Sequence, residues 1–257
     1  MTKDPDPKID PKIESQIDHK IDPLVTHSWM DEYHQPFPKY VAVEGPIGAG
    51  KTTLAHELAQ LLDYKCFEEP TSKQKNPLLH DFYKDPQSFA FPMQIQMLTI
   101  RLELERSATT QIATQEIKGA VTDRTTDGDS VFAFLNYQLG NISLPLYQLY
   151  LRTFNIMKSI RPYPDLIIYL DVPVPTLKQR IKQRNRSFEQ NLTKQDDTYL
   201  YMLERAYQPF LHAISAFSCV ISIPWHDFKP TNTVWNRALQ QYQAVQHSRF
   251  EKTLLRH

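Results

Sequence analysis

The residues from Gly45 to Thr52 follow the pattern G-x-x-x-x-G-K-[ST], which is typical of a phosphate-binding loop. In such a loop, successive backbone N–H groups turn toward a polyphosphate, the lysine reaches the outer phosphates, and the Ser or Thr hydroxyl binds Mg²⁺. A glycine turn that closes an α/β unit is the alternative interpretation, but it does not explain the Lys51-Thr52 pair. The pattern therefore predicts a nucleotide site in which Lys51 is catalytic and Thr52 is a metal ligand. Its other predicted residues are Gly45, Pro46, Ile47, Gly48, Ala49, Gly50 and Thr53.

The loop lies between the two elements that the motif requires. The apolar run Tyr40 to Val43 precedes it, and the helical stretch Thr53 to Leu62 follows it with its positive end toward the phosphates. Further apolar runs alternate with helical segments, including long ones from about Ser88 to Lys118 and from Asp197 to Phe217. This alternation predicts an α/β fold with a parallel sheet covered by helices on both faces. The predicted strands are Tyr40 to Glu44, Lys65 to Glu68, Ala120 to Thr122, Leu166 to Val172 and Cys219 to Ile223.

The composition excludes several classes of protein. The 257 residues include 29 basic and 29 acidic ones, so no global field would attract nucleic acid or an anionic membrane. Cys66 and Cys219 lie in apolar runs, which suits buried thiols in a reducing compartment better than a disulfide. No stretch reaches the roughly 18 apolar residues of a spanning helix, and the N-terminus is too charged for a secretory signal. We expect a cytoplasmic protein with no nucleic-acid or membrane partner.

The first 38 residues differ from the rest of the chain. They contain Pro, Asp, Lys and single Ile residues in near-copies of Pro7-Lys8-Ile9-Asp10, which cannot bury enough apolar surface to offset the entropy of ordering. We expect residues 1–38 to be a disordered extension and residues 39–257 to form one folded domain. Trp29, Tyr33 and Phe37 could pack on that domain or on a partner, but a loose tail is the preferred interpretation.

Polar residues directly after each apolar run are site candidates, because ligands bind beyond the carboxyl ends of parallel strands. Glu68-Glu69-Pro70 follows the second run, and a carboxylate there could accept a proton from an attacking hydroxyl. Asp123-Arg124-Thr125 follows the third, with one group suited to magnesium and one to a transferring phosphoryl group. Asp171 follows the fourth run. A surface turn or a helix cap is the alternative for each position taken singly.

A basic segment lies between the fourth and fifth runs. Arg180 and Arg184 are four residues apart on one predicted helical face, and Arg186 follows them. A solvated basic helix is the ordinary explanation of such a segment. A kinase with a phosphate-binding loop, however, needs a lid that brings arginines over the phosphoryl group and excludes water. We therefore interpret the three arginines as phosphate contacts on an arginine-rich lid.

In this order, the motifs resemble those of the deoxynucleoside kinases, which include deoxycytidine, deoxyguanosine and bacterial deoxyadenosine kinases. The resemblance runs from about Lys39 to about Tyr242. It rests on the phosphate-binding loop, Glu69-Pro70, the run Phe91 to Arg101, Asp123-Arg124-Thr125 with Asp129, the lid segment with Glu189, and Asp227-Phe228. It implies a P-loop kinase fold with a five-stranded parallel sheet, helices on both faces, an arginine-rich lid and a homodimer.

The resemblance also implies roles for the matching residues. Glu69 would take the proton of the sugar 5′-hydroxyl, Arg124 would contact that hydroxyl or the phosphoryl group, and Asp123 would help hold magnesium. Asp227 and Phe228 would lie over the base of the phosphate donor.

The nucleoside would have its own set of contacts. Gln94 would recognise the nucleobase edge, a paired Arg101 and Asp129 would contact the other side of the base, and Tyr83 with Glu189 would bind the 3′-hydroxyl. Met97, one helical turn beyond Gln94, either shapes the base pocket or packs in the core. The complete predicted set is Tyr83, Gln94, Met97, Arg101, Arg124, Asp129 and Glu189.

We therefore predict an enzyme of nucleotide salvage that transfers the γ-phosphoryl group of ATP or another nucleoside triphosphate, with Mg²⁺, to the 5′-hydroxyl of a deoxyribonucleoside. The run from Gln94 to Arg101 is most similar to bacterial deoxyadenosine and deoxyguanosine kinases, which favours a purine. One alternative is a nucleoside monophosphate kinase of the thymidylate kinase type, whose anionic acceptor needs no general base. Another is a non-catalytic kinase-like accessory subunit, which would have lost residues of the phosphate site.

Overall fold

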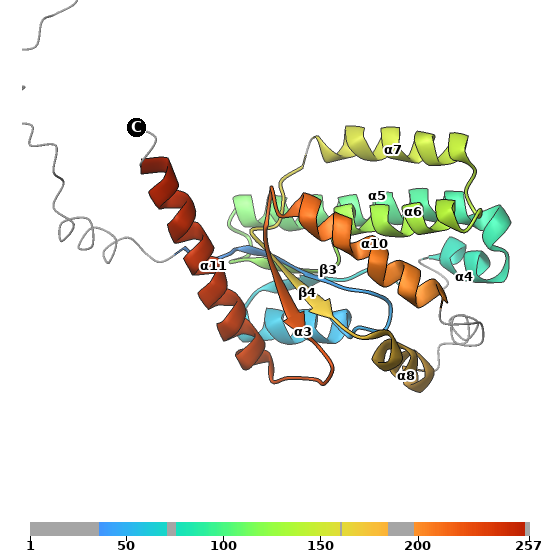
Figure 1. Ribbon diagram of the computed structural model, residues 1–257. Helices are drawn as coiled ribbons and strands as arrows, with labels where there is room; N and C mark the ends of the chain where they lie inside the picture. Colours follow the sequence, from blue (N-terminus) through green and yellow to red (C-terminus); the bar gives the residue numbers. More distant parts are fainter. Residues whose placement is uncertain (1–35, 71–75, 160, 185–197, 255–257) are drawn as a thin grey trace, which may run out of the picture. The chain divides into compact units, whose positions relative to one another are not determined.

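The computed structural model describes residues 36–70, 76–159, 161–184 and 198–254 of the chain (Figure 1). The residues from Phe37 onward belong to one compact unit. At its start, the ring of Phe37 packs against that of Trp235, with the ring centroids 5.5 Å apart. Trp29 and Tyr33 of the predicted extension lie outside the described residues.

Five parallel strands form the sheet, in the order β2-β3-β1-β4-β5. Their bounds are Tyr40–Glu44 (β1), Lys65–Phe67 (β2), Ala120–Asp123 (β3), Leu166–Asp171 (β4) and Cys219–Pro224 (β5), each within one residue of the predicted strand. β1 occupies the centre, where Val43 pairs with Asp123 on one side and with Ile168 on the other. Because the strands are parallel, the loops that follow them meet at one edge of the sheet.

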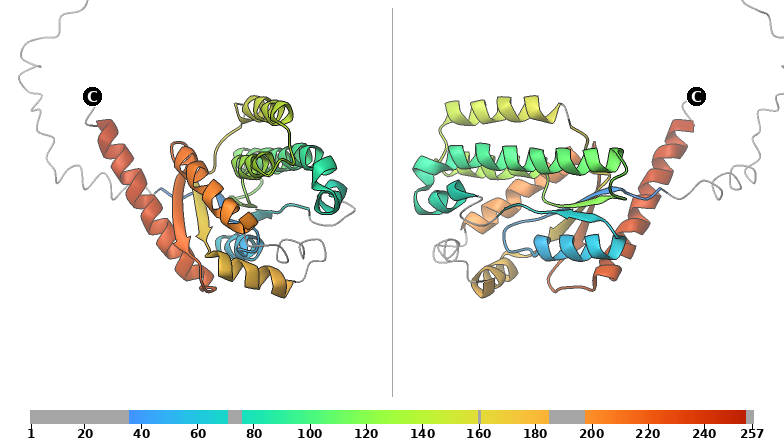
Figure 2. Two further views of the ribbon diagram at one scale, coloured as in Figure 1. Left: turned by 45° about the vertical axis from the view of Figure 1, so that its right-hand side comes forward. Right: turned by 180° about the vertical axis from the view of Figure 1, so that it is seen from behind.

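Helices cover both faces of the sheet, as predicted (Figure 1, Figure 2). One face packs against α3 (Lys51–Leu62), α8 (Val174–Arg184) and α11 (Thr231–Leu254), and the other against α5 (Pro86–Ala113), α6 (Thr126–Gln138) and α10 (Thr198–Ile214). α4 (Pro77–Lys84) packs on α5, while α7 (Leu144–Lys158) forms an outer layer over α5 and α6 (Figure 1). Within the described ranges, no helix is both long and apolar enough to cross a membrane.

Both faces of β4 are covered by helices, which explains why its sequence is apolar without a break. Leu166, Ile168 and Leu170 belong to the core cluster that includes α3 and α11. Ile167 and Tyr169 belong to the cluster that includes α6 and α10. Since successive side chains of a strand point to opposite faces, a strand that is covered on both sides buries every residue.

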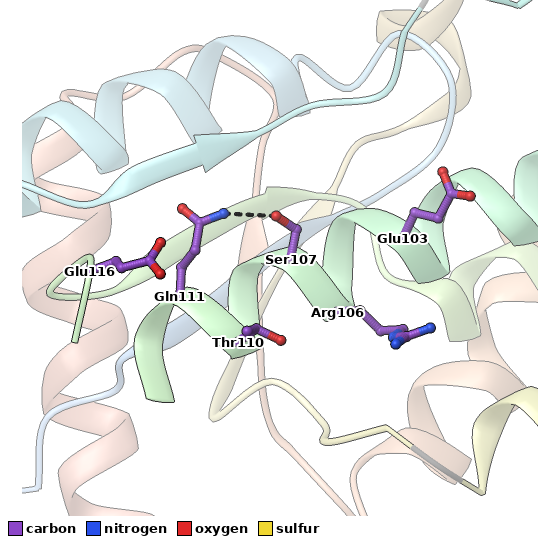
Figure 3. Close-up of a pocket in the computed structure, with 6 residues that line it drawn as sticks. All are labelled: Glu103, Arg106, Ser107, Thr110, Gln111 and Glu116. Atoms are coloured by element: carbon purple, nitrogen blue, oxygen red, sulfur yellow. Dashed lines mark hydrogen bonds between the residues drawn. The ribbon is translucent and has the colours of Figure 1, made fainter. Parts of the chain in front are cut away.

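Helix α5 starts and ends a few residues earlier than the predicted stretch Ser88 to Lys118. Asp85 caps it by accepting a hydrogen bond from the Ser88 N–H at 3.2 Å, and Pro86 occupies its first turn. The helix buries Gln94, Arg101 and Glu105 on the face toward the sheet. Its outer face borders a shallow polar hollow of about 370 Å³ (Figure 3). The hollow is lined by Glu103, Arg106, Ser107, Thr110, Gln111 and Glu116.

Candidate active site

The phosphate-binding loop joins β1 directly to α3. Gly50 is the N-cap of α3 and has a φ of 92°, in the left-handed region that favours glycine. Lys51 is the first residue of the helix, and its buried ammonium donates a hydrogen bond to the Pro46 carbonyl at 2.8 Å. Burial, together with the positive charge of Arg124, lowers the pKa of Lys51 to about 7. A bound polyphosphate would favour the charged form of this amine.

Thr52 and Asp123 lie together at the end of β3, as a shared metal site requires. The Thr52 hydroxyl donates a hydrogen bond to Oδ2 of Asp123. The other carboxylate oxygen, Oδ1, is buried and has no hydrogen-bond partner in the part of the chain that the structure describes. A hydroxyl beside a carboxylate with one uncommitted oxygen matches the hard oxygen ligands of Mg²⁺. Among the described residues, no group of three or more His, Cys, Asp or Glu side chains could hold a metal, so water and phosphate would supply the remaining ligands.

Glu69 and Asp129 are joined through one arginine. The Arg101 Nε donates to Oε1 of Glu69, and its Nη1 donates to Oδ1 of Asp129, so the predicted Arg101–Asp129 pair is present. The second oxygen of Asp129 accepts a hydrogen bond from the Tyr150 hydroxyl at 2.6 Å. Burial opposes ionisation of Glu69, but Arg101, Arg124 and Lys51 still hold its pKa below the ordinary value, so the carboxylate is ionised at neutral pH.

Arg124 is held in place by contacts on several sides. Its φ of 79° lies in the left-handed region, a strained conformation for a residue with a side chain. Its Nη1 donates to the Gly45 carbonyl at 3.0 Å and to the Tyr207 hydroxyl at 2.7 Å, and its guanidinium lies 4.7 Å from the ring centroid of Phe132. The Tyr207 hydroxyl also donates to the Gly45 carbonyl at 2.9 Å. These contacts fix the guanidinium against the first residue of the phosphate-binding loop.

A buried carboxylate supports the turn that carries Arg124. Glu44, the last residue of β1, is fully buried and accepts hydrogen bonds from the Thr125 N–H at 2.7 Å and the Thr125 hydroxyl at 2.8 Å. It also lies 3.8 Å from the Arg124 guanidinium. A Cβ atom on Gly128 would come within 2.2 Å of its Oε1, so only glycine fits at that position without movement.

The predicted base-binding residues line the inner face of α5. Gln94 is buried, and its Nε2 finds no hydrogen-bond partner within the described residues. Met97 belongs to a buried apolar cluster with Phe82, and its sulfur accepts a hydrogen bond from the Asn76 side chain at 3.1 Å. Tyr83, the predicted sugar contact, lies half-buried beside that cluster on α4. An unpartnered buried amide is costly, so the Nε2 of Gln94 is a group that could donate a hydrogen bond to a ligand.

The other residues that are predicted to bind the phosphate donor lie near the start of α3. Arg180 donates to the carbonyls of Ala49 at 3.2 Å and His226 at 2.9 Å, and its guanidinium lies 4.4 Å from the ring centroid of Phe228. Asp227 is exposed in the same loop. A pocket of about 210 Å³ opens here. It is lined by Gly50, Thr53, Leu54, Glu57, Trp225, Phe228 and Lys229. The structure therefore places Arg180 beside the loop of Phe228, where it ties that loop to the phosphate-binding loop.

Only part of the predicted lid is described. Arg184 ends α8 and is exposed, whereas Arg186 and Glu189 lie outside the described residues. Asp171, the polar residue after the fourth run, is exposed at the end of β4.

Comparison with known proteins identifies the family. A model of the deoxynucleoside kinases matches residues 41–245. The chain belongs to the deoxynucleoside kinase family. It is 36% identical over 206 residues to a deoxyadenosine kinase of Dictyostelium discoideum, covering 80% of both chains. It is also 36% identical over 201 residues to a deoxyguanosine kinase of the same organism, covering 78% of this chain and 68% of the relative.

A solved structure agrees with this assignment. The deoxyadenosine kinase of M. mycoides with bound dCTP superposes with a TM-score of 0.65 at 28% identity, covering 78% of this chain and 98% of the other. This deoxynucleoside kinase is accordingly an ATP-dependent phosphotransferase that phosphorylates a deoxynucleoside, as the sequence predicted.

Several residues that support the site of this deoxynucleoside kinase were not predicted from its sequence. Glu44 could have been identified from the sequence, because it is an acidic residue at the end of an otherwise apolar strand. Tyr207 and Tyr150 had no such signal, since each lies in a helical pattern where a buried polar group is indistinguishable from core. Asn76 directly precedes Pro77, which is the signal of a helix cap and not of a site residue. Asn76 caps α4 and also donates to the Pro70 carbonyl at 3.3 Å, next to Glu69.

Proposed function

We propose that this deoxynucleoside kinase transfers the γ-phosphoryl group of ATP, or of a similar triphosphate, to the 5′-hydroxyl of a purine deoxyribonucleoside in nucleotide salvage. The observation that supports this most directly is the position of Glu69. Its ionised carboxylate follows β2, accepts a hydrogen bond from Arg101, and lies within the electrostatic reach of Lys51 and Arg124. A base at that place suits a neutral alcohol acceptor.

Glu69 acts as the general base. It accepts the proton of the 5′-hydroxyl as the O5′–P bond forms and the bond from the γ-phosphorus to the bridging oxygen of the donor breaks. Lys51 and Arg124 neutralise the charge that spreads over the phosphoryl oxygens. Mg²⁺, held by Thr52 and Asp123, would supply charge neutralisation on the donor phosphates.

The nucleoside binds along the inner face of α5. Gln94 contacts the base edge with an amide that offers both a donor and an acceptor, and Arg101 with Asp129 contacts the opposite side. The preference for a purine is supported by the two relatives of equal identity, which are a deoxyadenosine and a deoxyguanosine kinase. Tyr83 and Glu189 bind the 3′-hydroxyl.

The donor base occupies the pocket beside Phe228. The exposed ring of Phe228 and the guanidinium of Arg180 offer flat surfaces on which a base can stack. Arg184 and Arg186 of the lid contact the donor phosphates.

A second copy of the chain covers the outer face of α7. This helix exposes large apolar side chains at Leu144, Leu146, Leu149 and Ile156, and neighbouring α6 exposes Phe134. Such a row of apolar groups on the outermost layer is typical of an interface between subunits. We therefore propose a homodimer through α7.

We further propose that the enzyme is cytoplasmic and that the kinase domain begins slightly before the predicted boundary at residue 39, because the ring of Phe37 packs against that of Trp235. Residues 1–35 of the predicted extension lie outside the described residues. The start of the domain is supported by the backbone N–H groups of Lys39 and Tyr40, which both donate to Asp165 at 2.9 Å.

The test is a phosphate-transfer panel with labelled ATP and Mg²⁺ over the four deoxynucleosides, their ribose counterparts and the deoxynucleoside monophosphates. We expect the highest kcat/KM with a purine deoxynucleoside and no transfer to monophosphates. Transfer to a monophosphate alone would instead favour the thymidylate kinase type. Absence of any transfer, with a stable partner protein that co-purifies, would favour an accessory subunit, although Lys51, Glu69 and Arg124 are all retained.

A further inference from the structure

Tyr150 lies behind the proposed base-binding pair. It belongs to α7 and is fully buried, and its hydroxyl donates to Oδ2 of Asp129 at 2.6 Å. The other oxygen of Asp129 accepts from Arg101. Each oxygen of this carboxylate therefore has one protein donor and keeps one lone pair for a ligand. Because Tyr150 is itself fully buried, its effect on a nucleoside would pass through Asp129.

The chemistry of the two donors determines what Asp129 can recognise. A hydrogen bond to the charged form of a carboxylate stabilises that form, and an ionised carboxylate only accepts hydrogen bonds. The 6-amino group of adenine donates hydrogen bonds, whereas the oxygen at the same position of a 6-oxo purine accepts them. An ionised Asp129 that faces position 6 of the base thus favours the amino group and repels the oxo group.

We propose that Tyr150 is a positioning residue for base selection. Its hydroxyl holds Asp129 oriented and ionised, and so makes the enzyme prefer a 6-amino purine deoxynucleoside to its 6-oxo analogue. This inference rests on the proposed contact between Asp129 and the base, and it narrows the substrate class from purine deoxynucleosides to deoxyadenosine.

The charged surroundings of Asp129 predict when the preference is lost. Burial raises the pKa of Asp129 to about 6, and the negative charge of Glu69, after β2, adds to this effect. Three groups act in the opposite direction and lower the pKa: Arg101 from α5, Tyr150 from α7 and Arg124 after β3. At pH 7.5 the carboxylate is ionised. As the pH falls through about 6, Asp129 gains a proton and becomes a donor, which removes its preference for an amino group.

The experiment compares deoxyadenosine with 2′-deoxyinosine, which differ at position 6 and in the protonation of N1. In the full-length enzyme, Tyr150→Phe should lower the ratio of the two kcat/KM values about tenfold, the effect of one hydrogen bond to a charged group. The change should come from a higher KM for deoxyadenosine, with kcat nearly constant. Tyr147→Phe is the matched control, because Tyr147 lies on the same helix and its ring stacks on that of Tyr137, with the centroids 4.7 Å apart. The ratio of the two kcat/KM values should not change in this variant.

The outcomes separate this inference from the proposed function. A wild-type enzyme that phosphorylates no deoxynucleoside overturns the proposed function on which the inference rests. A wild-type enzyme that phosphorylates deoxyadenosine, with the same ratio in Tyr150→Phe, overturns the inference alone. If Tyr150→Phe does not fold, Tyr150→Leu replaces it in the same comparison, and the ratio for the wild type is also measured between pH 7.5 and pH 5.5. A ratio that falls through about pH 6 supports the inference, and a constant ratio overturns it.

Discussion

Replacing Glu69 by Gln removes the proposed base and its negative charge. The amide has the same shape as the carboxylate and can still accept the hydrogen bond of Arg101. We expect kcat to fall by a factor on the order of 100 or more, the range of a lost general base. The KM for the nucleoside should change little, because the base contacts Gln94 and Asp129 are unchanged. Three cations, Lys51, Arg101 and Arg124, lose a counter-charge, so binding of the triphosphate should tighten.

The pH dependence of the wild type adds an independent measurement. Since the pKa of Glu69 lies below its ordinary value, the base stays ionised down to acidic pH, and kcat should be flat from pH 8 to pH 5. The KM for deoxyadenosine should instead rise below about pH 6, where Asp129 becomes protonated. A kcat that falls along with the protonation of Asp129 would contradict this division of roles.

Glu68→Gln provides the matched control. Glu68 is the preceding residue, and its side chain is 53% exposed and forms a hydrogen bond with His56 at 2.9 Å. Surface pairs of this kind contribute little, so this variant should keep full activity. The assay is steady-state transfer of labelled phosphate to deoxyadenosine for both variants. Equal kcat values for Glu69→Gln and Glu68→Gln would refute the assignment of the base.

Three further predictions concern the residues that hold the site in place and the protonation of Lys51. Gly128→Ala should lower the free energy of unfolding by about 3 kcal/mol in denaturant titrations, because the new Cβ would meet the buried Glu44 carboxylate at 2.2 Å. Tyr207→Phe should lower kcat about tenfold with little change in KM, because Arg124 loses the hydroxyl that it contacts at 2.7 Å. Binding of ATP at pH 8.5 should take up about one proton, because the pKa of Lys51 is about 7 in the free site and rises beside phosphates.

Each of these predictions has its own contradicting result. An unchanged denaturation midpoint in Gly128→Ala would show that Glu44 can move at no cost. For Tyr207, the control is Tyr169→Phe, a buried tyrosine whose ring lies 5.4 Å away, and equal kcat values in the two variants would exclude a specific role. Proton uptake is measured by calorimetry in buffers of different ionisation enthalpy. Lys51→Arg should abolish it, because a guanidinium stays charged at this pH, and uptake that persists would assign the proton elsewhere.

The features that the sequence predicted well are those that depend on neighbouring residues. The phosphate-binding loop between β1 and α3 follows from glycines and a Lys-Thr pair in direct succession. The strands follow from short apolar runs, and the parallel sheet follows from their alternation with helices. Glu69 and Asp123 were found because each comes directly after a predicted apolar run, and parallel strands bring such positions to one edge.

The hydrogen-bond partners that hold the site residues in place became visible only in the tertiary structure. Tyr207 meets Arg124 across 83 residues, and Tyr150 meets Asp129 across 21. In both cases a helical pattern identifies a buried side chain but not the group that it faces, because periodicity determines only which face of a helix is covered. The partner depends on how α10 and α7 pack on α6, and that packing is set by the shapes of three helices together. The sequence therefore determined which groups could do the chemistry, while the packing of the helices decided which groups hold them in place.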